Sequence, residues 1–117
     1  MLTLPETSNI AFISADYRLA PQSNINLILE DTVDAVKFIR QTLPGLVEDR
    51  INPEKLAVSG GSAGGWLALL AGIPLDGQPG SVTPPVTCMV GIYPITDVDT
   101  DFYTRKQRPV SYWPAGM

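Results

Sequence analysis

The residue with the clearest chemical potential is Ser62, at the centre of the run Gly60-Gly61-Ser62-Ala63-Gly64. This run fits the pattern G-x-S-x-G, in which a serine on a sharp strand-to-helix turn presents its hydroxyl as a nucleophile. The apolar residues before the run predict a strand, and the helix-forming residues after it predict a helix, so the context agrees with the pattern. Ser62 is therefore a candidate nucleophile.

The glycines of this run have a steric explanation. A sharp turn forces Ser62 into a strained backbone conformation and brings the residues two before and two after it close together. Only glycine is expected to fit at both of those positions, which are Gly60 and Gly64, with Gly61 completing the turn geometry. The backbone N–H of Ala63 is expected to point into the space beside the serine and to form half of an oxyanion hole.

Two other interpretations of the glycine-rich run remain open. The glycines can simply give a tight connection with close helix–sheet packing, or they can cradle a phosphate group at the helix N-terminus. The sequence contains neither G-x-x-x-x-G-K-[ST] nor G-x-G-x-x-G, which weakens the phosphate interpretation. We predict no cofactor and no metal site.

The chain contains no histidine, so it lacks the usual base that activates a serine. Asp97, Asp99 and Asp101 follow the last predicted strand, on the side where Ser62 should emerge. A carboxylate is a weak base near neutral pH unless it is strongly desolvated, so a solvated acidic loop is the favoured interpretation of these residues. We therefore expect little or no turnover by this chain alone.

Composition excludes several functional classes. The net charge of −4 argues against nucleic-acid binding, which needs clustered Lys and Arg. The single cysteine, Cys88, excludes an internal disulfide, and its apolar neighbours predict a small buried side chain. The first six residues do not resemble a signal peptide, and no apolar run is long enough for a membrane span, so we expect a cytoplasmic protein.

The predicted fold class is α/β, with the order β-α-β-α-β and three parallel strands joined by crossover helices. Pro44-Gly45 should stop the first helix, and either Asn24 or Asn26 should cap its start. The tail after Ile95 is predicted to be loop with one helical turn. The predicted strands are 10–14, 55–59 and 86–93, and the predicted helices are about 29–43 and 66–71.

Three acidic residues lie in the first half of the first predicted helix, namely Glu30, Asp31 and Asp34. Acids at this end of a helix are favoured by its dipole, so a solvent-exposed face that matches the dipole is one interpretation. A structural contact near the turn that carries Ser62 is the other. The sequence leaves both open.

Three segments together resemble a known family. Asp16-Tyr17-Arg18-Leu19-Ala20-Pro21, the glycine-flanked Ser62 and Ile92-Tyr93-Pro94 are similar to the middle of an α/β-hydrolase, over about residues 10–96. The closest similarity is to the hormone-sensitive-lipase-like esterases, also called alpha/beta hydrolase fold-3. The resemblance implies that Ser62 is acylated during hydrolysis of a small-molecule carboxylic ester. It also implies that the Ala63 N–H belongs to the oxyanion hole and that Asp16, Tyr17 and Arg18 are structural.

The sequence departs from this family in three ways. Gly61 stands where many members have Asp or Glu, and Gln22 follows Pro21 where many have Glu. The His-Gly-Gly-Gly loop, the catalytic Asp and the catalytic His of the family are absent, so residues 1–117 are predicted to be one incomplete α/β-hydrolase domain. The alternative is a non-catalytic binding module whose open sheet edges pair with another chain or with a second copy.

Overall fold

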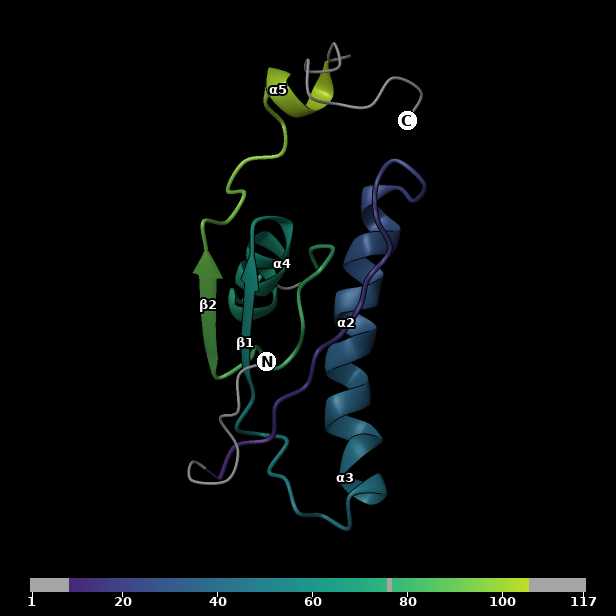
Figure 1. Cartoon of the computed structure of the whole chain (residues 1–117), viewed down its shortest axis with the longest axis vertical. Coiled ribbons are helices and arrows are strands. Elements are labelled where there is room, and N and C mark those ends of the chain that lie inside the picture. The colour runs from purple at the N-terminus through teal and green to yellow at the C-terminus, as the bar shows by residue number, and fades with distance from the viewer. Residues whose placement is uncertain (1–8, 76, 106–117) are drawn as a thin grey trace.

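A short parallel sheet lies beside two longer helices in this chain (Figure 1). The computed structural model describes residues 9–75 and 77–105. Helix α4 packs against both strands, helix α2 packs against α4, and α5 lies beyond the end of β2. The elements are α2 (Ile25–Gln41), α3 (Leu43–Leu46), β1 (Ala57–Gly61), α4 (Ala63–Gly72), β2 (Cys88–Ile92) and α5 (Asp101–Thr104).

The strands β1 and β2 pair in parallel, with a register that runs from Ala57 opposite Cys88 to Gly61 opposite Ile92. Helix α4 connects them, so β1-α4-β2 is a βαβ unit whose two strands end at the same edge of the sheet. This confirms the predicted α/β class and the predicted crossover. It also brings the residues after β1 and after β2 together.

The predicted strand at 10–14 is wrong for this structure. Residues 9–18 have no regular secondary structure, and the described sheet has two strands rather than three. The segment instead runs along α2, where Ile13 and Ala15 share a shallow groove with Phe38 and Ile39. An apolar run becomes a strand only when a neighbour completes its ladder of hydrogen bonds. Within residues 9–75 and 77–105, this run has no such neighbour.

Helix α2 begins where one of the two predicted caps lies. The Asn24 side chain accepts a hydrogen bond from the Leu27 backbone N–H at 3.1 Å, which satisfies one of the free N–H groups of the first turn. The helix ends at Gln41, where the Thr42 N–H bonds the Phe38 carbonyl. Pro44-Gly45 does not end the helical region as predicted, because both residues lie inside the short helix α3. Proline is tolerated in a first helical turn.

The core consists of two small apolar clusters between α2, α4 and the loop before β2. Helix α4 contributes to both clusters, as expected for a helix with few polar residues. One cluster contains Val36, Ala71, Val82 and Val86, with Val33, Leu56 and Val58 packed against it. The other contains Ile28, Leu29 and Leu67, with Tyr17, Trp66 and Leu70 packed against it.

Cys88 is exposed, so the prediction that it is buried is wrong. It opens β2, whose only partner among the described residues is β1. Four of the five β2 residues are exposed, including the half-exposed Val90 and Ile92. A strand of parallel sheet is normally covered on both faces, which is why its apolar sequence predicted burial.

Candidate active site

Ser62 lies at the junction between the last residue of β1 and the first residue of α4. Its backbone has φ 54° and ψ −117°, which is a region that non-glycine residues rarely occupy. Its side chain does not cap the helix, and the residue is exposed. The strained strand-to-helix turn predicted from the sequence is therefore present, with an exposed serine at its tip.

Backbone hydrogen bonds hold this turn against the end of β2. The Ser62 N–H donates to the Ile92 carbonyl at 3.0 Å. The Ser62 carbonyl accepts from the Ile95 N–H and from the Trp66 N–H, each at 3.2 Å. Three hydrogen bonds therefore hold the backbone of Ser62, one through its N–H and two through its carbonyl. Its hydroxyl does not cap the helix.

Gly60 is the glycine that the turn requires. A Cβ atom placed on Gly60 would collide with the backbone of Gly64, with the Gly64 Cα only 2.9 Å away. The expectation that Gly64 is equally constrained is wrong. A Cβ on Gly64 would meet nothing closer than the Tyr17 hydroxyl at 3.8 Å, which is an ordinary contact. The close approach therefore excludes a side chain at position 60 but leaves room for one at position 64.

Two further close contacts were not predicted from the sequence. A Cβ on Gly65 would lie 2.9 Å from the Gly60 carbonyl oxygen and 3.0 Å from the Pro94 Cβ. A Cβ on Gly61 would lie 3.0 Å from the Tyr93 hydroxyl. The double glycines on each side of Ser62 are the only signal in the sequence that further close packing was present. The identity of the packed residues depends on how the end of β2 folds.

The Ala63 N–H is suitably placed to stabilise negative charge. Ala63 is the first residue of α4, and the first N–H groups of a helix have no acceptor within the helix. The N-terminus of a helix also carries partial positive charge. An oxygen atom that becomes negative beside Ser62 would therefore meet a favourable potential. The oxyanion-hole role of Ala63 stays a prediction.

Two of the three acidic side chains that follow β2 make local contacts. The Asp97 carboxylate accepts a hydrogen bond from the Asp99 backbone N–H at 2.9 Å, and both residues are exposed. The Asp101 carboxylate forms an ion pair with Arg105 at 2.8 Å.

No group of three or more His, Cys, Asp or Glu side chains in the described ranges could hold a metal ion. In the same ranges, no helix has the length and apolar character needed to cross a bilayer.

Residues 1–115 match the family model described as alpha/beta hydrolase fold. The chain belongs to this family. The expected family membership and the α/β-hydrolase fold class are thereby confirmed. No solved structure matches the chain.

Known alpha/beta hydrolase relatives are considerably longer. An AB hydrolase superfamily protein of Schizosaccharomyces pombe is 29% identical over 86% of the chain and 28% of its own length. Ethyl acetate hydrolase of Pseudomonas putida is 33% identical over 80% of the chain and 28% of its own length. Arylacetamide deacetylase of Oryctolagus cuniculus is 43% identical over 51% of the chain and 15% of its own length. The chain therefore spans less than a third of each of these relatives.

The Asp16-Tyr17-Arg18 segment of this alpha/beta hydrolase chain braces the elements around the turn. The Arg18 guanidinium lies 2.8 Å from the Asp31 carboxylate, and the Arg18 backbone N–H donates to the same carboxylate at 2.8 Å. A further bond joins the guanidinium to the Leu27 carbonyl at 2.9 Å. Tyr17 packs on the core cluster that contains Leu67 of α4. Asp31 is therefore in a structural contact that links the segment before α2 to α2 itself.

The Arg18–Asp31 pair should make stability sensitive to acid. The hydrogen bonds that Arg18 donates, first from its side chain and then from its backbone, hold the pKa of Asp31 below its usual value. A lowered pKa stabilises the fold above the ordinary carboxyl pKa of about 3.9 and ceases to do so as the pH falls through the folded-state value. We expect Asp31→Asn to flatten the loss of stability between about pH 5 and pH 2 in urea unfolding curves.

Glu30→Gln is the matched control for this measurement, because Glu30 lies 3.8 Å from the same guanidinium without a hydrogen bond to it. It should preserve the acid-dependent loss that Asp31→Asn removes. Equal pH dependence in the Asp31→Asn variant and the original chain would contradict the role of this pair.

Proposed function

We propose that this chain carries the nucleophile of a serine hydrolase that cleaves carboxylic esters, and that Ser62 is the nucleophile. The observation that carries the proposal is an exposed serine, Ser62, with a backbone φ of 54° at the carboxyl end of β1 and the N-terminus of α4. A strained turn of this kind is found where function requires it, because the strain itself costs stability. The G-x-S-x-G pattern and membership of the family support the same role.

The proposed reaction has two halves. A base removes the Ser62 hydroxyl proton while the oxygen attacks the ester carbonyl carbon, and the Ala63 N–H donates to the oxygen that becomes negative. The carbon–oxygen bond to the alcohol then breaks, and the alcohol leaves with the proton from the base. In the second half, the base takes a proton from water while the water oxygen attacks the acyl-Ser62 carbonyl carbon. The bond between that carbon and the Ser62 oxygen then breaks, the acid leaves, and the base returns the proton to the Ser62 oxygen.

The proposed base lies outside these 117 residues. The chain has no histidine, and the carboxylates of Asp97 and Asp101 are engaged in local contacts. A carboxylate is protonated well below neutral pH, so it is a poor substitute for an imidazole. The chain is therefore proposed to be inactive by itself and to act together with polypeptide that supplies the base and a second oxyanion donor.

The class of substrate follows from the relatives. The name of ethyl acetate hydrolase states that this relative hydrolyses a carboxylic ester, and its match covers 80% of this chain. A small-molecule carboxylic ester is accordingly the proposed substrate here.

Labelling with a fluorophosphonate tests the proposal. The natural protein, with all the polypeptide that belongs to it, should be labelled at Ser62, because the probe reacts with activated serines. The 117-residue chain alone should remain unlabelled, because its serine has no base. Mass spectrometry of the labelled peptide locates the site. Absence of Ser62 labelling in the natural protein would contradict the function, and efficient labelling of the chain alone would contradict the missing base.

A non-catalytic binding module is the second candidate function. The observation that favours it is the exposed apolar surface of β2, where Val90 and Ile92 are 50% and 52% exposed. Such a surface on a short sheet is suited to pairing with another strand or with a second copy of the chain. A stable dimer in light scattering, combined with no Ser62 labelling in the natural protein, would favour this function over hydrolysis.

A further inference from the structure

Tyr93 is a strained and exposed residue that the proposed chemistry does not use. It follows β2 directly, its φ is 40°, and it is 77% exposed. The left-handed region costs a non-glycine residue conformational free energy. Burial of the aromatic ring does not offset this cost, because the ring lies largely in solvent.

The surrounding backbone fixes the conformation of Tyr93. On one side, the Ile92 carbonyl accepts the Ser62 N–H, and on the other the Ile95 N–H donates to the Ser62 carbonyl. Pro94 lies in the space left by two glycines, since a Cβ on Gly65 or on Gly91 would approach it to about 3.0 or 3.1 Å. These contacts hold the backbone on both sides of Tyr93.

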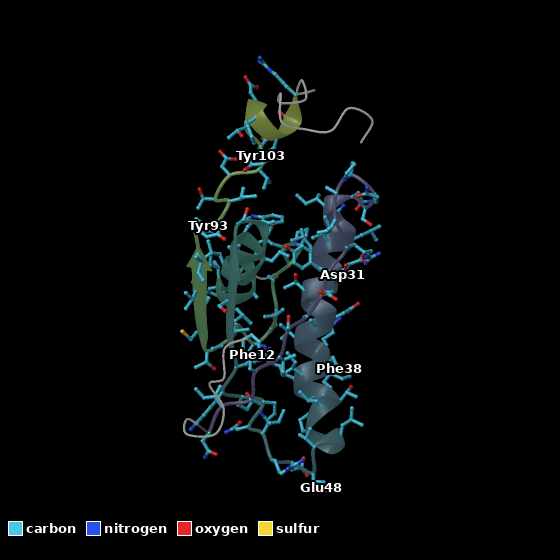
Figure 2. All side chains as sticks on the ribbon, viewed as in Figure 1. Phe12, Asp31, Phe38, Glu48, Tyr93 and Tyr103 are labelled. Atoms are coloured by element: carbon cyan, nitrogen blue, oxygen red, sulfur yellow. The ribbon has the colours of Figure 1, made fainter. Side chains whose placement is uncertain are left out.

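The ring is directed towards the residue before the candidate nucleophile. A Cβ on Gly61 would lie 3.0 Å from the Tyr93 hydroxyl oxygen, 3.3 Å from its Cζ and 3.6 Å from its Cε2. The lack of a side chain at Gly61 therefore makes room for the end of the ring. Figure 2 shows Tyr93 beside the end of β2, well apart from Tyr103 on α5.

We infer that Tyr93 is a specificity-determining residue of the Ser62 site, whose ring contacts the apolar part of the bound ester. This inference rests on the proposed function. An exposed aromatic ring whose end lies against Gly61, the residue before Ser62, offers apolar surface that a ligand can cover, and covering it stabilises the complex in proportion to the area buried. Esters with longer acyl chains should gain more from the ring than acetyl esters.

The test compares p-nitrophenyl hexanoate with p-nitrophenyl acetate in the natural protein, with all of its polypeptide. Tyr93→Asn removes the ring, and asparagine tolerates a positive φ, so the turn should be preserved. We expect the hexanoate-to-acetate ratio of kcat/KM to fall about tenfold, the effect expected when apolar contact with a few methylene groups is lost. Tyr93→Phe keeps the ring and should leave the ratio within about twofold of the original, since one hydroxyl is all that it loses.

Two further variants complete the test. Gly61→Ala keeps Tyr93 but displaces its ring, so it should lower the same ratio. Tyr103→Asn removes another exposed tyrosine, at 49% exposure, and should leave the ratio unchanged. An unchanged ratio in a folded Tyr93→Asn protein that still hydrolyses both esters through Ser62 would overturn the inference alone. Hydrolysis that does not require Ser62 would overturn the proposed function and the inference with it.

Discussion

Ser62→Ala in the natural protein is expected to lower kcat for ester hydrolysis by at least about 10⁴-fold, because the proposed acyl intermediate forms on the oxygen that this substitution removes. The substitution removes a single oxygen atom from an exposed side chain, and alanine has no greater difficulty than serine with the backbone at this position. The fold should therefore survive. The measurement is the initial rate with p-nitrophenyl acetate, alongside a urea unfolding curve that checks stability.

Ser59→Ala is the matched control for this loss. Ser59 is another exposed serine of β1, within the same strand that leads to the turn. It is expected to retain the original kcat within about twofold, as surface substitutions away from special features usually do. Comparable rates for Ser62→Ala and the original protein would show that some other group performs the attack.

Gly60→Ala is expected to destabilise the chain by about 3 kcal/mol, because the added methyl group would overlap the Gly64 backbone. Backbone atoms at the start of α4 cannot move aside as a flexible side chain can. The helix would have to shift away from β1, which would disturb the hydrogen bond between the Ser62 N–H and the Ile92 carbonyl. Urea unfolding followed by circular dichroism measures the loss.

Two glycine-to-alanine variants serve as controls for Gly60→Ala. Gly64→Ala should cost less than about 1 kcal/mol, because its methyl group meets only the Tyr17 hydroxyl at 3.8 Å. Gly45→Ala has nothing within 4 Å and lies in α3, where alanine is the better helix former by up to about 1 kcal/mol. Equal losses at Gly60 and Gly64 would contradict the one-sided constraint described above.

The turn at Ser62 could be predicted from the sequence because its requirements are local. Glycine at positions 60 and 64, an apolar strand before and a helix after are all visible within a short window, and the structure has that strand–turn–helix order. The cap at Asn24 was predictable for the same reason. The difference between Gly60 and Gly64 was not, because a symmetrical pattern does not reveal which of the two backbones is approached.

Features that depend on distant neighbours were not predictable. Residues 10–14 have the composition of a strand, yet pairing needs a partner that the sequence pattern cannot name, and Phe12 is 75% exposed. Cys88 was predicted to be buried for a similar reason, since an apolar strand normally has cover on both faces. The position of the Tyr93 ring depends on a positive φ and on where Pro94 packs, and the sequence reveals neither of these.

The hydrogen bonds that join Ser62 to Ile92 and Ile95 also have a consequence for biosynthesis. The ribosome must deliver the whole of α4 and β2 before these bonds can form, because they link residues far apart in the chain. A nascent polypeptide that ends before Ile92 would lack both of these bonds, so no contact with the end of β2 would hold the Ser62 backbone. These two bonds can therefore hold the turn only after the second strand has paired with the first.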